Sequence, residues 1–327
     1  GSDELEAERL FTWTLLAGGL YALWAIVTFL QSPGFVLGLE KQMHVERLTG
    51  SFLSANTAGS LFGALGCALA VRLFRRVGRK LGSHAAREAD DLSRWGGELR
   101  DAALLALLWI ALLLTVSRAA LSVSLAVVAL FALLELRRYV RRRRLKGRAS
   151  LFAGAAVLAA FVVLLLGSLS SQLQGQFGRL AADAVSRTGI LDAYGPDLAA
   201  TPLTGHGLGG FPALNSQQMT PENFADLWSL GAAHNILLQW WLEAGPVGTA
   251  LAAAVILLLA ARLIQRMATG RVGRWRAAAA LAASAVLLAH NTVDYSLEVQ
   301  GIASLWALLL GLGLAERSRS DRPIDEA

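Results

Sequence analysis

The stretch from residue 101 to residue 136 reads DAALLALLWI ALLLTVSRAA LSVSLAVVAL FALLEL. Two apolar runs, 101–116 and 119–136, flank a short polar step that ends in Arg118. A membrane-spanning helix needs roughly 20 mostly apolar residues. We therefore interpret this stretch as two spanning helices joined by a tight turn, with the guanidinium of Arg118 at the turn.

Similar apolar stretches recur along the 327-residue chain. They lie near residues 10–30, 52–72, 150–168, 237–262, 277–290 and 299–315. With 55% hydrophobic and 17% charged residues, the chain is too apolar for an ordinary soluble domain. We predict an all-α, polytopic bundle of about eight transmembrane helices that forms a single integral membrane domain over residues 1–327.

The basic residues predict the orientation of the bundle. Alternate segments between the apolar stretches carry 25 of the 30 Lys and Arg residues, eight of them within 137–148, and the intervening segments carry five. Cytoplasmic loops of membrane proteins carry an excess of Lys and Arg, so we place both termini in the cytoplasm. The same distribution favours membrane topology over nucleic-acid binding as the reason for the net charge of +6.

Two polar segments interrupt the apolar rhythm. Residues 73–100 form a predicted cytoplasmic loop, and residues 169–233 form a long predicted periplasmic loop. Between 177 and 191, apolar residues recur at the spacing of an amphipathic helix on a membrane surface. The glycine- and proline-rich segment 196–212 follows as an irregular turn, and long loops of this kind usually carry function.

Polar and ionisable side chains gather on the predicted outer side of the membrane. Four of the five histidines map to that side or its boundary, whereas His84 is cytoplasmic. The whole outer group is His44, His206, His234, His290, Arg47, Arg118, Arg187, Asn56, Asn235, Asn291 and Asp294. Ionisable groups are costly to place at a membrane boundary, so each is a candidate for function.

Three of these residues have distinct chemical interpretations. Arg118 can bind a phosphate or pyrophosphate through its planar guanidinium, or it can extend to lipid headgroups. His234 can accept a proton from an attacking hydroxyl near neutral pH, although a lone histidine is more often structural. Asp294 can orient a histidine or cap the helix that follows it.

The pattern of ligand-type residues argues against a metal centre. The single cysteine, Cys67, lies inside an apolar stretch. The four candidate ligands are His206, His234, His290 and Asp294, and no two of these histidines have the i,i+4 spacing of the histidine pair in an HExxH-type site. We expect no metal ion and no cofactor.

Four short motifs occur in an order that matches a known family. They are RLTGSFLSAN at 47–56, TVSRAAL at 115–121, GHGLGGF at 205–211, and AHNILLQ at 233–239 followed by EAGPVG at 243–248. They resemble, in turn, an Arg-x-x-Gly-x-Phe-x-Asn-Pro-Asn segment, a Ser-Arg-Gly-Ala hairpin, a Gly-x-Gly-x-Gly-x-Phe loop and a His-Asn-x-x-Leu-Gln…Glu-x-Gly-x-x-Gly signature. This is the pattern of the O-antigen ligase and O-antigen polymerase family.

The resemblance implies an enzyme and assigns roles. It implies a metal-independent transferase that moves a glycan from undecaprenyl pyrophosphate to an acceptor sugar hydroxyl at the periplasmic face of the bacterial inner membrane. The arginines matching Arg118 and Arg187 are expected to hold the pyrophosphate, and the histidine matching His234 to act on the acceptor. The remaining matched residues are expected to bind substrate: Arg47, Asn56, His206, Asn235, His290 and Asp294.

The sequence leaves three classes of acceptor open. Lipid A core, a growing polysaccharide and a protein each fit a member of this class, and HNTVDYSL at 290–297 resembles the polymerase-like branch. The chain also departs from the family pattern. Members usually have further spanning helices ahead of the stretch at 10–30, so the resemblance is to the C-terminal part of the family fold. Residues 54–56 lack the Asn-Pro, and Ala232 stands where many members have a second histidine.

Two other classes of function are the alternatives. A secondary transporter or flippase predicts charged or broken helices near mid-bilayer and an inverted repeat, whereas the helix centres here are almost free of charge. A purely structural subunit leaves Arg118 and His234 unexplained. A transferase predicts that Arg118, Arg187 and His234 surround one outer cavity.

Overall fold

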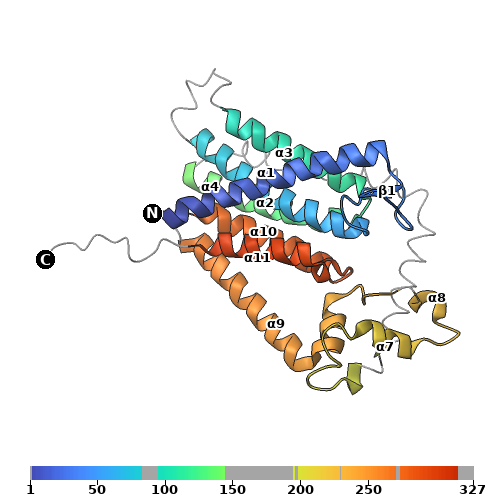
Figure 1. Cartoon of the computed structure of the whole chain (residues 1–327). Helices are drawn as coiled ribbons and strands as arrows, with labels where there is room; N and C mark the ends of the chain where they lie inside the picture. The colour runs from blue at the N-terminus through green and yellow to red at the C-terminus, as the bar shows by residue number, and fades with distance from the viewer. Residues whose placement is uncertain are drawn as a thin grey trace. The chain divides into compact units, whose positions relative to one another are not determined.

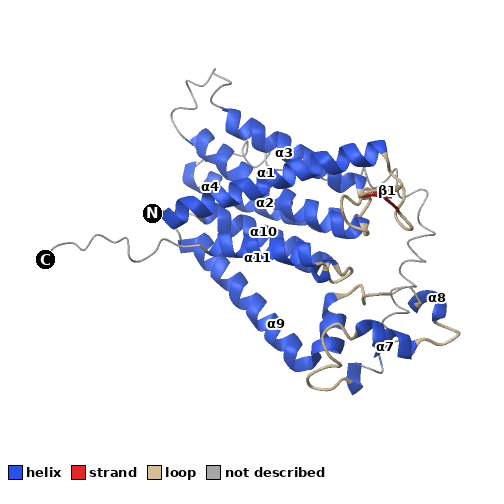
Figure 2. Cartoon of the chain, viewed as in Figure 1, coloured by secondary structure: helices blue, strands red, loops and turns tan. Residues whose placement is uncertain are grey.

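The structure is a computed structural model that describes residues 2–82, 95–143, 194–195, 198–228, 230–269 and 273–315 (Figure 1). Within these residues the regular structure is helical, apart from one antiparallel pair of two-residue strands, β1 (Phe35–Val36) and β2 (Leu39–Glu40) (Figure 2). The prediction of an all-α helical bundle is confirmed.

The chain divides into two compact units, 1–143 with 257–327, and 144–256. The described helices of the first unit are α1 (Ser2–Gln31), α2 (Ala55–Gly82), α3 (Gly96–Leu114), α4 (Arg118–Arg143), α10 (Arg274–His290), the 3-10 helix η3 (Ser296–Glu298) and α11 (Gln300–Leu314). The second unit contains the short helices α7 (Phe211–Gln218) and α8 (Phe224–Leu227). The long helix α9 (Ile236–Thr269) begins in the second unit and ends in the first.

Four of the described helices, α1, α2, α4 and α9, are long and apolar enough to cross a membrane. Helix α11 is apolar but shorter. Each predicted apolar stretch overlaps a described helix except 150–168, which lies outside the described residues. The total of about eight spans stays a prediction.

Helix α2 forms the core of the first unit and packs against α10, α4 and α3. In its most apolar window 89% of the residues are buried, against 33% in α1 and in α4. Small residues permit the close packing: a Cβ added at Gly59 would lie 2.9 Å from Cβ of Ser117 and 3.0 Å from Cβ of Ala120. Small residues let helix backbones approach each other in this way in membrane bundles.

Ion pairs hold the C-terminal part of α2 against α3 and α4. The buried carboxylate of Asp101 lies 3.2 Å from Arg72, and Glu135 lies 2.9 Å from Arg75. Because buried charges are tolerated only when paired, these contacts tie α2 to α3 and α4. Helix α2 therefore continues through residues 73–82, which the sequence had assigned to a loop.

Candidate functional site

Arg47 is anchored at the end of the first unit that is predicted to face the periplasm. Its Nε donates to the carbonyl of Thr115 at 2.8 Å, and its Nη2 donates to Oδ1 of Asn56 at 3.0 Å. Its Nη1 lies 3.1 Å from Nδ1 of His44. Asn56 lies in the first turn of α2 and Thr115 directly follows α3. The structure thus brings together two predicted residues, Arg47 and Asn56, beside the turn between α3 and α4.

Lys41 is a second cation in the same place, and it is one of the five basic residues in the segments predicted to lie outside the cytoplasm. Its side chain is buried, and Nζ donates to the carbonyl of Arg47 at 3.1 Å and lies 5.6 Å from the ring centroid of Phe29. Burial lowers the pKa of the Lys41 ammonium. The sequence has no signal that separates a buried lysine in a loop from a solvated one, so the burial of Lys41 could not be predicted.

Arg118 is the first residue of α4 and follows a strained turn. Val116 has a φ of 53°, and the turn is closed by the Thr115 hydroxyl, which donates to the carbonyl of Leu112 at 2.6 Å and accepts from the amide of Ser117 at 3.2 Å. The Arg118 side chain is half-buried and forms no hydrogen bond or ion pair with any residue that the structure describes. A guanidinium held in this way is available to an anionic ligand.

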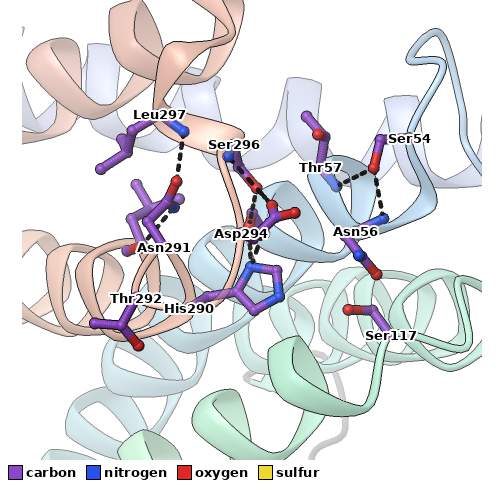
Figure 3. Close-up of polar contacts among 12 residues, drawn as sticks. Ser54, Asn56, Thr57, Ser117, His290, Asn291, Thr292, Asp294, Ser296 and Leu297 are labelled. Carbon is purple, nitrogen blue, oxygen red and sulfur yellow. Dashed lines mark hydrogen bonds and ion pairs between the residues drawn. The ribbon is translucent and has the colours of Figure 1, made fainter. Parts of the chain in front are cut away.

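His290 and Asp294 are joined by a buried network that includes two serines (Figure 3). Nδ1 of His290 lies 2.6 Å from Oγ of Ser60, which lies 2.7 Å from Oγ of Ser296. The Ser296 hydroxyl donates to Oδ2 of Asp294, and its amide donates to the same oxygen at 3.2 Å. Nδ1 of His290 is itself 3.8 Å from that carboxylate. The network joins α2 to the turn between α10 and η3.

The network gives both predicted residues structural partners. His290 is 1% exposed and Asp294 is 0% exposed. Asp294 lies beside His290, and its Oδ2 accepts from the amide of Ser296, the first residue of η3, whose N-cap position is Tyr295. Both roles considered for Asp294 in the sequence stay predictions. Asn291 extends the arrangement, since its Oδ1 accepts from the amide of Leu297 at 2.8 Å. Substrate contact by His290 or Asp294 stays a prediction, and the structure places both side chains in the interior.

Burial also affects Tyr295, which lies between the apolar helices α10 and α11. The phenol is half-buried, and burial raises its pKa, with a further increase from the nearby Asp294 carboxylate; a hydrogen bond with Ser54 opposes the shift. Ser54 caps α2, because its hydroxyl accepts from the amides of Asn56 at 3.2 Å and Thr57 at 3.4 Å (Figure 3).

In the second unit, the turn that carries His206 docks on a kink in α9. The kink is at Gly245, where φ is 68° and ψ is 179° and the helical hydrogen bonds are interrupted. The amide of His206 donates to the carbonyl of Leu242 at 2.9 Å, and the amide of Gly207 donates to that of Glu243 at 3.0 Å. The turn thus satisfies backbone groups that the kink leaves open.

Two glycines make this docking possible. A Cβ at Gly205 would overlap the backbone of Glu243 and Gly245, and a Cβ at Gly245 would overlap the backbone of Gly205 and Leu203. Gly205 also has a φ of 73°, which favours glycine. Both glycines belong to the motifs at 205–211 and 243–248, but the sequence has no local signal that they meet.

His234 immediately precedes the residue that caps α9. It is half-buried and has a φ of 51°, which is uncommon for a residue with a side chain. Oδ1 of Asn235 accepts from the amides of Leu237 at 3.0 Å and Leu238 at 3.2 Å. Asn235, predicted to bind substrate, therefore has a capping role in the structure.

The predicted catalytic residues fall in different parts of the chain. Arg118 belongs to the first unit and His234 to the second. Arg187 and the amphipathic helix expected between 177 and 191 lie outside the described residues. Convergence of the three side chains on one outer cavity stays a prediction.

Comparison with known protein families gives a match to one family model. Residues 103–253 match the family model described as O-Antigen ligase. The resemblance to the O-antigen ligase family is confirmed. A search of curated proteins gives no match. The spanning helices and the O-antigen ligase match together support a multi-pass membrane protein with a glycosyltransferase-like function in polysaccharide biosynthesis.

The O-antigen ligase match contains five of the predicted site residues: Arg118, Arg187, His206, His234 and Asn235. The other four, Arg47, Asn56, His290 and Asp294, lie outside the matched range in sequence. In the first unit, however, Arg47 and the hairpin that carries Arg118 are linked through the carbonyl of Thr115.

An open cavity of about 500 Å³ lies beside the end of α1 and the β1–β2 hairpin. Trp24, Thr28, Gln31, Phe35 and Gly50 are among its lining residues. None of the predicted site residues lines it, although Gly50 belongs to the motif at 47–56.

Acidic, histidine and cysteine side chains were also considered as metal ligands. Among the residues that the structure describes, no group of three or more of them could hold a metal ion. Metal independence stays a prediction.

Proposed function

We propose that the protein transfers an oligosaccharide or polysaccharide from undecaprenyl pyrophosphate to the hydroxyl of an acceptor sugar. The proposal rests above all on the match of residues 103–253 to the O-antigen ligase family, since this segment contains both Arg118 and His234. The reaction takes place at the periplasmic face of a bacterial inner membrane, with both termini in the cytoplasm, as the distribution of Lys and Arg favours.

The reaction is a displacement at the anomeric carbon of the donor sugar. The acceptor oxygen attacks that carbon, and the bond between the carbon and the pyrophosphate oxygen breaks. His234 accepts the proton of the acceptor hydroxyl as general base. Undecaprenyl pyrophosphate leaves with the electron pair of the broken bond.

The arginines stabilise the charge that develops on the leaving group. Pyrophosphate is already a good leaving group, so the protein has to supply orientation and positive charge, and a divalent ion is not required. The guanidinium of Arg118, which has no partner among the described residues, supports this role, since it can form two parallel hydrogen bonds to phosphate oxygens. Arg187 supplies a second such group. Arg47, fixed through Thr115 beside the same turn, adds positive charge next to Arg118.

The acceptor distinguishes the members of this class. Lipid A core makes the enzyme a ligase, a second carrier-linked repeat makes it a polymerase, and a protein side chain makes it an oligosaccharyl transferase. The segment 290–297 favours the polymerase-like branch, and the structure assigns that segment to the buried network around His290.

The test is the surface glycan profile of a strain that lacks the gene, complemented with the wild-type chain or with His234→Ala. Gel and mass-spectrometric analysis distinguish the reactions. Carrier-linked polymer with bare lipid A core indicates a missing ligase, and acceptors with one repeat unit indicate a missing polymerase. His84→Ala, the same change on the predicted cytoplasmic side, is the matched control and should restore the profile. A normal profile with His234→Ala, present in the membrane at wild-type level, would exclude the proposed base.

A further inference from the structure

Glu243 is a buried carboxylate to which the proposed mechanism gives no role. It is 6% exposed, lies just before the kink at Gly245, and forms no ion pair with any described residue. Its Oε1 accepts a hydrogen bond from the amide of Phe211 at 3.1 Å. The same oxygen accepts from Nε2 of Gln239 at 3.4 Å. A buried carboxylate whose hydrogen-bond donors among the described residues are neutral calls for an explanation.

Gln239 continues the chain of contacts in the other direction. It lies one helical turn before Glu243 and is also 6% exposed. Its Oε1 accepts from the amide of Ala233 at 3.1 Å. A carboxamide suits this position because one end donates to the carboxylate while the other end accepts from the backbone.

The two ends of this chain are the two segments that carry the candidate histidines. Phe211 directly follows the glycine-rich turn of His206, and Ala233 directly precedes His234. The backbone of His234 has a φ of 51°, a conformation that persists only where its surroundings hold it. The amide of the preceding residue is fixed by Gln239, and Gln239 is in turn oriented by Glu243.

We infer that Glu243 is a positioning residue that, through Gln239, holds the backbone of His234 in its strained conformation and fixes it relative to the turn of His206. This inference rests on the proposed function of His234. Glu243 touches neither donor nor acceptor in this role. Its contribution is to keep the imidazole where it can reach the acceptor hydroxyl, and displacement by about 1 Å can cost on the order of a hundredfold in rate.

The proposed role of Glu243 requires an oxygen that accepts hydrogen bonds and does not require a negative charge. Two variants at this position separate these two properties. Glu243→Gln keeps an oxygen at the end of a side chain of the same length, so it can still accept from Phe211 and Gln239. Glu243→Ala removes that oxygen. Gln239→Glu interrupts the chain at the next link, because it replaces the donor to Glu243 with a second oxygen.

The experiment measures kcat and KM of the purified full chain in phospholipid nanodiscs. The donor is carrier-linked glycan extracted from the native cells, and thermal unfolding measured by tryptophan fluorescence reports whether each variant is folded. We expect Glu243→Ala and Gln239→Glu to lower kcat at least tenfold with KM changed less than about threefold, and Glu243→Gln to keep most of the wild-type kcat. If Glu243 had only a structural role, each variant would lose activity in proportion to its loss of folded protein.

Three results would overturn the inference: folded Glu243→Ala with wild-type kcat, Glu243→Gln as inactive as Glu243→Ala, or a decrease in kcat that follows the unfolded fraction. If Glu243→Ala does not fold, Gln239→Glu takes its place with the same criteria. His234→Ala in the same assay separates the two proposals. Full activity of His234→Ala contradicts the proposed function, whereas an inactive His234→Ala beside a fully active Glu243→Ala contradicts only the positioning role.

Discussion

The two units hold their candidate histidines in different ways. In the first unit, His290 is 1% exposed and its imidazole is bonded to the hydroxyl of Ser60, within a network made of side chains. In the second unit, His234 is half-buried on a backbone with a φ of 51°, and the neighbouring turn is fixed mainly by backbone contacts around Gly205. The same residue type is therefore part of the interior packing in one unit and is partly exposed in the other. Burial, not the presence of a motif histidine, distinguishes the two.

The largest effect is expected where the backbone of the turn that carries His206 contacts the backbone of α9 at the Gly245 kink. Gly205→Ala places a Cβ on the backbone of Glu243 and Gly245, so it should destabilise the protein by more than about 4 kcal/mol. Gly207→Ala is the control: its φ is also positive, at 103°, but nothing lies within 4 Å of the added Cβ, so only backbone strain of about 2 kcal/mol is expected. Thermal unfolding of the purified variants measures the difference. Equal midpoints would contradict the docking of the turn on the kink.

Arg118→Ala tests whether an arginine without a described partner acts on substrate. Loss of a charged, two-pronged contact should lower kcat/KM for the carrier-linked donor by about 10- to 100-fold while the unfolding midpoint stays unchanged. Arg118→Lys should restore little, because an ammonium lacks the planar fork. Arg138→Ala, at the opposite end of α4, provides the matched control and should leave the transfer rate at the wild-type level. A strong loss of stability in Arg118→Ala would show that the side chain is structural.

His290→Ala sharpens the comparison between the two histidines. It removes the partner of Ser60 beside the buried carboxylate of Asp294, which should lower the free energy of unfolding by about 2–3 kcal/mol. His234→Ala should change that free energy by much less. Chemical denaturation followed by tryptophan fluorescence gives both values. If His290→Ala unfolds at the wild-type denaturant concentration, the network does not support the fold.

The smallest effect is expected at the cap of α9. Asn235→Ala removes the acceptor for the amides of Leu237 and Leu238, which should cost about 1 kcal/mol. Asn235→Asp should keep this stability, because its carboxylate accepts the same bonds at a helix N-terminus. A normal unfolding midpoint for Asn235→Ala would contradict the capping role. Unequal transfer rates of folded Asn235→Asp and the wild type would indicate the substrate contact predicted from the sequence.

The sequence predicted much of the helical framework, because apolar run length and spacing are local properties. The hairpin of α3 and α4, with Arg118 at its turn, follows directly from the stretch 101–136. The extension of α2 through 73–82 did not follow, because a charged helix end is stable only when partners such as Asp101 are close in space. A hydropathy pattern predicts that a helix ends where charged residues begin, whereas ion pairs with neighbouring helices allow the helix to continue.

The sequence indicated candidate residues for the site but not the contacts that these residues make in the fold. Ser60 and His290 are 230 positions apart, so the bond that buries the histidine has no local signal. The contact of Gly205 with Gly245 is likewise a tertiary feature. The motifs gave the candidate residues, and the fold shows which of the described ones are buried and which are partly exposed.

The most direct test of the account is the rate of glycan transfer by the purified chain in nanodiscs, with and without the imidazole of His234. Carrier-linked glycan and acceptor are mixed with equal amounts of folded wild type or His234→Ala, and the joined product is quantified by mass spectrometry. The account predicts product formation by the wild type and a rate about 10²- to 10⁴-fold lower for His234→Ala, the range typical of a general base. Equal rates for the two proteins would contradict it.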